Sequence, residues 1–415
     1  MGKRVLIIGG GASGLMAAIM AAGEGAKVTV LERESQVGKK LLVTGNGRCN
    51  LSNRNQQLSN YRCEKPEFVA RALGVFGQTE TQEFFQQLGI YLKDKNGYLY
   101  PYSQQATAVA DVLRMEAVER GVKLSCNTSI QGIEKKEGRF LVKTPGWTYE
   151  GEALLLACGS LAHGGSGDGY VYAKQFGHEV TPVLPALVQL KASRDWPGQL
   201  AGIRMDARVS LLVGEELLAE DTGEVQFLSY GISGIPVFQV SRYGARALAQ
   251  KSQVEVRLHL LPSFSREELE AFLAKRVEGK GTRAVEPWLL GLFPQKLIPV
   301  LLKRAGISKG QRARELTRQD LGRLAEEISQ FRVPIVGTNG YSQAQICTGG
   351  IGLAQVKPET MESSLVSGLY FAGEILDVDG ACGGYNLQWA WTSGCLAGRG
   401  AARGETARGK EAERI

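Results

Sequence analysis

The chain has 415 residues, enough for two to three domains that each bury a core without disulfide or metal support. Its 43% hydrophobic and 22% charged residues are ordinary for globular proteins, which excludes collagen, coiled-coil and low-complexity classes. The formal net charge of +7 is compatible with anionic ligands but too diffuse to indicate nucleic-acid binding. Glycine stands out at 53 residues, about twice its usual share, so we expect it where the backbone turns sharply or approaches a ligand.

The first thirty residues predict a strand, a glycine turn, a helix and a second strand. Residues 3–8 and 27–31 are short apolar runs typical of buried strands. Residues 12–22 are rich in alanine, methionine and leucine and lead into glycine, which is typical of a helix and its end. The opening is therefore a βαβ unit.

The turn of this unit has the pattern Gly-x-Gly-x-x-Gly of dinucleotide-binding loops. Gly9 permits the tight turn, Gly11 lets the backbone touch a pyrophosphate at the helix N-terminus, and Gly14 lets the helix pack closely. Glu32 closes the second strand and can accept a hydrogen bond from a ribose hydroxyl. An acid at this position disfavours a 2′-phosphate, so the pattern predicts FAD or NAD rather than NADP.

In the rest of the chain, the residue pattern that predicts secondary structure changes three times. Helical patterns at 68–88 and 106–120 precede short strands, and a mainly β segment follows from about residue 190. Ser265 and Glu268 form a capping box at the start of a helical stretch. The glycine-rich α/β texture returns near the C-terminus.

These changes predict an α/β fold in which a Rossmann-type domain is discontinuous. We place its first part at 1–188, a β-rich insertion at 189–262 that closes with 331–348, a small helical module at 263–330, and the second part at 349–415.

Two later segments favour FAD over NAD. Residues 154–159 form a strand that ends in a small-residue turn, and residues 368–374 form a strand that ends in Gly373 and Glu374. Together with the first motif they resemble the three-part pattern of glutathione-reductase-type flavoproteins, in which the middle element is Ala-Thr-Gly and the last is Gly-Asp. Here Cys158 replaces the threonine and Glu374 the aspartate. A ribityl chain needs a polar partner, for which Glu374, Asp377 and Asp379 are available.

A glycine pair before the last helix predicts where the flavin edge lies. Gly383 and Gly384 leave free backbone amides at a helix start, which suits the negative charge of a reduced flavin. A further glycine turn carries Lys40 and Arg48, positive groups that can meet the pyrophosphate or the isoalloxazine.

Over essentially its full length the chain resembles the BaiN/YhiN-like family of bacterial FAD-dependent oxidoreductases. The resemblance is carried by residues 45–50 (GNGRCN), 164–170 (GGSGDGY), 360–363 (TMES), 373–380 (GEILDVDG) and 383–386 (GGYN). It implies a Rossmann-type FAD domain interrupted by a β-barrel-like module and a small helical module. It also implies, for some members, NADH-dependent reduction of carbon–carbon double bonds in 3-oxo bile-acid intermediates, and for others aminoacetone oxidation.

The motifs and the resemblance together predict one set of cofactor-binding residues. The FAD set is Gly9, Gly11, Ala12, Ser13, Gly14, Glu32, Arg33, Lys40, Gly47, Arg48, Cys49, Ile130, Cys158, Gly159, Gly373, Glu374, Asp379, Gly384, Tyr385, Asn386 and Leu387.

We expect an NADH-dependent ene-reductase acting on a small bile-acid or steroid-like enone. No second Gly-x-Gly-x-x-Gly unit occurs between residues 60 and 330, so NADH would meet the flavin transiently. Tyr385 is the preferred proton donor, and His163 a weaker candidate. An amine oxidase that uses oxygen is the alternative, and an RNA-associated flavoprotein, with the basic run at 303–318 as its footprint, a minor one; no nucleic-acid partner is expected.

Cysteine spacing and the apolar start predict a cytoplasmic protein without metal. Seven cysteines include no Cys-x-x-Cys pair, which argues against a disulfide framework, a structural zinc site and a dithiol centre. Glycines and serines interrupt the apolar residues 5–22, and no cleavage-type site follows, so we expect neither a signal peptide nor a membrane segment.

Overall fold

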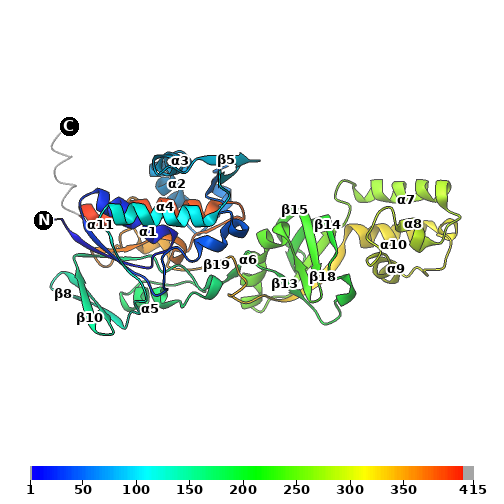
Figure 1. Ribbon diagram of the computed structural model, residues 1–415. Coiled ribbons are helices and arrows are strands. Elements are labelled where there is room, and N and C mark those ends of the chain that lie inside the picture. The colour runs from blue at the N-terminus through cyan, green and yellow to red at the C-terminus, as the bar shows by residue number, and fades with distance from the viewer. Residues whose placement is uncertain (1, 405–415) are drawn as a thin grey trace. The chain divides into compact units, whose positions relative to one another are not determined.

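The computed structural model describes residues 2–404, which divide into two units. Residues 2–183 and 346–404 form the first unit, and residues 184–345 form the second (Figure 1). The chain leaves and re-enters the first unit at neighbouring positions, because Val180 pairs with Ile351 and the amide of Thr181 donates to the carbonyl of Gly350 at 2.9 Å. The second unit is therefore one continuous insertion.

A five-stranded parallel sheet is the centre of the first unit. Its order is β20 (Leu369–Phe371), β11 (Ala153–Leu156), β1 (Arg4–Ile8), β2 (Lys27–Leu31) and β7 (Lys123–Ser125). The register pairs Ile8 with both Leu31 and Leu156. Since the strands are parallel, their carboxyl ends lie at one edge, where open α/β sheets bind ligands.

Three long helices and several smaller elements complete this unit. Helix α1 (Ala12–Gly23) packs against α4 (Ala106–Glu119) and against α11 (Tyr385–Arg403). Further elements are the helices α2 (Pro66–Val75), α3 (Gln78–Gln87) and α5 (Asp168–Gln175), the sheet of β8 (Gly132–Lys136), β9 (Arg139–Thr144) and β10 (Trp147–Gly151), the sheet of β3 (Ser52–Asn53), β6 (Tyr98–Pro101) and β5 (Leu92–Lys95), the pair β4 (Tyr61–Arg62) and β21 (Asp379–Gly380), and the strand β19 (Ile346–Thr348).

The second unit contains a closed six-stranded barrel and a group of helices. The barrel order is β13 (Leu190–Ala192), β16 (Gly231–Ser233), β15 (Glu216–Leu228), β14 (Arg204–Val213), β17 (Val254–His259) and β18 (Phe331–Thr338). The helices are α6 (Ile235–Ala249), α7 (Arg266–Lys280), α8 (Val285–Leu289), α9 (Ile298–Ala305) and α10 (Arg318–Ser329). The Rossmann-type, barrel and helical parts of the predicted fold class are confirmed.

The structure adds two details to the elements predicted from the sequence. Helix α6 lies inside the segment that we expected to be mainly β, and it packs against β14 and β15. The helical pattern predicted at 68–88 forms two helices, because the chain breaks at Phe76 and Gly77, and the amide of Gly77 donates to Glu80 at 2.8 Å to start α3. The expected Ser265 capping box is present at the start of α7.

The structure also shows whether helices could span a membrane and whether the cysteines are paired. Among the described residues, no helix combines the length and the apolar character that crossing a bilayer requires. All seven cysteines are free thiols.

Candidate functional site

The loop between β1 and α1 has two glycines with opposite surroundings. A Cβ on Gly14 would overlap with the carbonyl oxygen of Gly9, so close backbone packing requires this glycine. A Cβ on Gly11 would meet no protein atom within 4 Å. Gly9 has a φ of +101°, which glycine adopts without strain. The first-turn amides, which include those of Ala12 and Ser13, have no helical carbonyl to bond, so the open side of Gly11 suits an anionic group.

Glu32 holds this loop from the end of β2. One carboxylate oxygen accepts from the amide of Gly10 at 2.7 Å and the other from the amide of Glu34 at 2.8 Å. Each oxygen keeps a second lone pair for a ligand hydroxyl. Arg33 is exposed and pairs with Glu34 at 3.3 Å, on the surface beside the loop.

The three motifs meet at the carboxyl edge of the sheet. Cys158 and Gly159 follow β11, and the Cys158 thiol donates to the carbonyl of Ile8 at 3.6 Å. Gly373 follows β20, and a Cβ there would lie 2.5 Å from the Ser13 hydroxyl oxygen. Thus segments more than 140 residues apart in sequence form one surface around the start of α1.

Lys40 and Glu374 form an ion pair at this edge. Lys40 Nζ lies 2.5 Å from Glu374 Oε2, while Oε1 accepts from the Ser160 hydroxyl at 2.5 Å and the Cys347 amide at 2.9 Å. His163 lies nearby, where burial and the Lys40 charge hold its pKa below the usual range, against the opposing effect of Glu374. Ser160 and Cys347 were not among the predicted site residues.

The loop at 41–50 places polar groups beside the start of α11. Gly47 and Cys49 both have positive φ, and burial raises the pKa of the Cys49 thiol to about 12. Arg48 is exposed. Asn50 is buried, and its Oδ1 has no hydrogen-bond partner in the described part of the chain.

The start of α11 is packed tightly against that loop. Gly384 has a φ of +96°, and a Cβ there would lie 2.6 Å from the Ser52 carbonyl oxygen and 3.0 Å from Asn50 Oδ1. The Asn386 side chain accepts from the amide of Gly380 at 2.8 Å and donates to its carbonyl at 2.9 Å. It therefore fixes strand β21, in which Asp379 is buried.

The other predicted residues have mainly packing contacts. Tyr385 is 5% exposed, and its ring lies edge-on to Tyr61 with centroids 5.6 Å apart; burial raises its pKa. Leu387 is partly buried against the core. The carbonyl of Ile130 accepts from the Tyr172 hydroxyl at 3.3 Å.

Comparison with models of protein families identifies the family of this chain. The model of the HI0933-like protein Rossmann domain matches residues 3–400. The chain belongs to the HI0933-like family. Family membership confirms the predicted BaiN/YhiN-type resemblance, the FAD cofactor and the oxidoreductase class.

Relatives similar in sequence to this chain have two kinds of names. The chain is 43% identical to a 3-dehydro-bile acid delta(4,6)-reductase of Clostridium scindens over 405 residues, which cover 96% of this chain and 99% of the relative. It is 30% identical to a ribosomal RNA dihydrouridine synthase of Haemophilus influenzae, over 94% and 96% of the two chains. A solved 3-ketosteroid delta1-dehydrogenase from Sterolibacterium denitrificans is similar in fold, with a TM-score of 0.52, 13% identity and coverage of 96% and 99%.

The edge of the sheet fits FAD in two respects. The open side of Gly11 lies at the positive end of α1, where a pyrophosphate is stabilised. The unpartnered Oδ1 of Asn50 lies beside Gly384 at the start of α11, so a buried polar atom is available to a bound group. Asn50 belongs to the 45–50 motif but was not among the predicted residues; its polar side chain after two glycines was the available signal.

Proposed function

We propose that the protein is an NADH-dependent ene-reductase that saturates a carbon–carbon double bond in a 3-oxo bile-acid or steroid-like enone. The observation that carries this proposal is the 43% identity to a 3-dehydro-bile acid delta(4,6)-reductase along nearly the whole of both chains. Such extended similarity includes the loops at the carboxyl edge of the sheet as well as the inserted unit. A small-molecule substrate follows from the same relative.

Different residues of the first unit are proposed to bind different parts of FAD. Gly11, Ala12 and Ser13 offer backbone amides to the pyrophosphate, and Glu32 offers carboxylate oxygens to the adenosine ribose. Bound FAD supplies hydride transfer between a nicotinamide and an activated double bond. The amides at the start of α11 would stabilise negative charge that develops on the bound flavin.

Protonation of the substrate carbon requires a donor from the protein. Tyr385 is the proposed donor, because it is the first residue of α11 and its burial keeps the hydroxyl protonated at neutral pH. Lys40 and Glu374 are paired with each other, and we assign them to cofactor positioning.

A second candidate function is the reduction of uridine in RNA. It is favoured by the relatives named ribosomal RNA dihydrouridine synthase, which match 94% of this chain at 30% identity. The two reactions share one chemical step, since both saturate a carbon–carbon double bond that is conjugated to a carbonyl group. The same flavin edge can serve either substrate, so the acceptor must be found by experiment.

The test is an anaerobic titration of the purified yellow protein with NADH while the visible flavin band is recorded. We expect NADH to bleach the band and a 3-oxo-4-ene bile acid to restore it, with the saturated product identified by mass spectrometry. Restoration by a uridine-containing RNA and not by the enone would favour the second candidate. If NADH leaves the band unchanged and aminoacetone bleaches it, with oxygen restoring it, the protein is an amine oxidase and the reductase proposal is wrong.

A further inference from the structure

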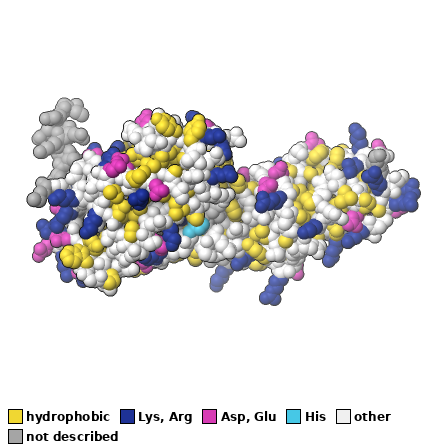
Figure 2. Space-filling model, viewed as in Figure 1, with side chains coloured by type: hydrophobic (Ala, Val, Ile, Leu, Met, Phe, Trp, Pro, Cys, Tyr) yellow, Lys and Arg dark blue, Asp and Glu magenta, His cyan; other side chains and the backbone are white. Residues whose placement is uncertain are grey.

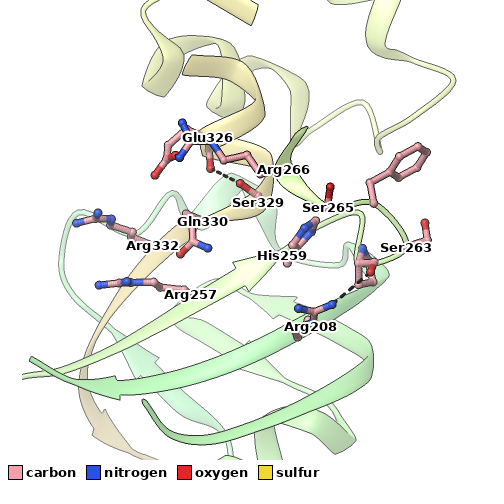
Figure 3. A pocket seen from close by; sticks show the side chains of 12 residues that line it. Arg208, Arg257, His259, Ser263, Ser265, Arg266, Glu326, Ser329, Gln330 and Arg332 are labelled. Carbon is pink, nitrogen blue, oxygen red and sulfur yellow. Dashed lines mark hydrogen bonds and ion pairs between the residues drawn. The ribbon is translucent and has the colours of Figure 1, made fainter. Parts of the chain in front are cut away.

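The second unit contains a basic cavity that the proposed reaction does not use. Its volume is about 550 Å³, and its wall carries four arginines and one glutamate (Figure 3). Figure 2 shows Lys and Arg side chains gathered over part of the surface of this unit. The charged residues of the wall are Arg208, Arg257, Arg266, Arg332 and Glu326.

The barrel places like charges directly opposite one another in this wall. In the register of β17 and β18, Arg257 faces Arg332. Arg208 faces His259, but burial and the Arg208 charge lower the pKa of that histidine, so it adds no like charge at neutral pH. Figure 3 shows the guanidinium groups of Arg257 and Arg332 directed to the same side of the pocket. Like charges opposite one another destabilise a sheet, so this arrangement needs a compensating negative charge.

Carboxylates of the protein pair with three of the four arginines, and Arg208 Nε lies 3.9 Å from Glu220 Oε1. Arg257 pairs with Glu255 at 2.8 Å and with the exposed Glu215 at 3.2 Å. Arg266 pairs with Glu326. Arg332 is exposed, and within residues 2–404 no ion pair holds its guanidinium.

Polar groups line the rest of the wall. Ser265 and Arg266 line it at the start of helix α7, where the Ser265 amide and hydroxyl are already bonded to Glu268 in the capping box. Ser329 and Gln330 add polar groups from the end of α10. Arginine is the side chain best suited to bidentate recognition of phosphate.

We propose that this cavity binds a phosphate group, with Arg332 and Arg257 as its principal contacts. The volume admits a phosphate ester larger than the inorganic ion. The ester can come from a small phosphorylated molecule or from the backbone of RNA. The site consists only of residues of the second unit and does not depend on the proposed reductase activity.

The first experiment measures binding of inorganic phosphate to the full-length holoprotein by calorimetry at low ionic strength. We expect Arg332→Gln to weaken binding by about tenfold or more, since one charge-assisted contact is lost. Arg318→Gln is the matched control, because Arg318 is an exposed arginine of the same unit outside the cavity wall. Absence of binding to the wild type, or equal binding to the wild type and Arg332→Gln, would overturn the proposal.

Thermal unfolding provides a second readout that is independent of calorimetry. Phosphate should raise the Tm of the wild type and of Arg318→Gln but not that of Arg332→Gln, since a ligand that binds only the folded state stabilises it. Without phosphate, Arg332→Gln should keep or raise the Tm, because it removes a like-charge neighbour of Arg257. A Tm increase with phosphate that is the same in all three proteins would place the ion elsewhere and overturn the assignment.

A short oligouridylate distinguishes the two sources of the phosphate. If RNA is the source, Arg332→Gln should weaken oligouridylate binding and reduce the slope of log K against log salt by about 0.7, the value for one phosphate contact on a single strand. If binding of the oligouridylate is absent or unaffected while inorganic phosphate binding is lost, a small phosphorylated molecule is the source. Both outcomes support the site, and only the first assigns it to RNA.

Discussion

Two glycines of the first loop are required for different reasons, and substitution can separate them. Gly11→Val should leave the fold intact, because a Cβ there meets no protein atom within 4 Å, and yield colourless protein because the side chain fills the place of the pyrophosphate. The free energy of unfolding of the apoprotein should change by about 1 kcal/mol or less. Flavin absorbance after purification and chemical denaturation check both statements.

Gly14→Ala is the matched comparison for that variant. Its methyl group overlaps with the carbonyl oxygen of Gly9, so it should lower the stability of the apoprotein as well as flavin content. Full flavin occupancy in Gly11→Val would contradict our assignment of the loop.

The role of Tyr385 can be tested by removing its hydroxyl group. Tyr385→Phe removes the hydroxyl and keeps the edge-on packing against Tyr61. If the hydroxyl delivers the proton, turnover of the enone should fall by about 100-fold while the flavin spectrum and the rate of bleaching by NADH stay unchanged. Unchanged turnover would reduce Tyr385 to a packing residue.

The buried thiols give a prediction about pH. Burial raises the pKa of both Cys49 and Cys158 to about 12, and the thiol is the form present below the pKa. At about pH 8 only about one in 10,000 molecules carries the thiolate at either position. Iodoacetamide should therefore leave both residues unmodified in the native protein and alkylate them after unfolding, as peptide mass spectrometry can measure.

At the residue scale, the local backbone of the first loop was predictable but its distant partners were not. Gly9 has the predicted turn geometry and Gly14 packs closely on its carbonyl, whereas a Cβ on Gly9 would also lie 2.4 Å from the carbonyl oxygen of the distant Ala157. The ion pair of Lys40 with Glu374 joins positions 334 residues apart, and the Ser160 hydroxyl completes it from a third loop. Only the parallel order of the strands brings these loops together, so the chemical type of each residue could be predicted but not its partner.

Among the elements, α11 depends on a close backbone approach to α1. It lies on α1 through Gly394, at which a Cβ would lie 2.5 Å from the Ser13 carbonyl oxygen and 3.1 Å from the Met16 Cβ. Gly394→Ala should lower the free energy of unfolding by about 1–3 kcal/mol and reduce flavin content, because α1 carries the first loop.

A helix glycine without such a contact should respond with the opposite sign. In α10 a Cβ on Gly322 would have its nearest neighbour, Glu270 Oε1, at 3.9 Å. Gly322→Ala should raise the free energy of unfolding by about 0.5–1 kcal/mol through helix propensity. Denaturant unfolding of the two variants measures both effects, and a loss of stability in both would mean that helix backbone, not the α1 contact, determines the response.

Prediction of elements from the sequence missed helix α6, because strand-like runs surround it. Helix α6 carries buried Val237, Val240 and Ala247, a helical spacing that was present in the sequence. The β-branched runs on either side dominated the interpretation of the segment. The strands β1, β2 and β11 were predicted well, because each is a short apolar run bounded by turn residues.

At the scale of the whole molecule, the insertion is separable in principle. The chain enters and leaves the first unit beside the hydrogen bond from Thr181 to Gly350. Replacing residues 184–345 with a short Gly-Ser linker should therefore give a folded yellow protein, since all the predicted FAD residues lie outside the replaced segment. It should lose enone reduction and phosphate binding. Absorbance, circular dichroism and calorimetry check these outcomes, and a colourless or unfolded product would show that the FAD unit depends on the insertion.

The order of the strands has a consequence for synthesis on the ribosome. The FAD unit needs β20 and α11, which are translated after the whole of Leu184–Gln345. Until α11 emerges, the face of α1 that carries Met16 and Ala17 has no cover from its final partner. The inserted unit, continuous in sequence and with a core of its own, can fold first, and the nascent N-terminal half must wait with exposed apolar surface. A chain truncated from its C-terminus would thus lose the flavin site before it loses the barrel.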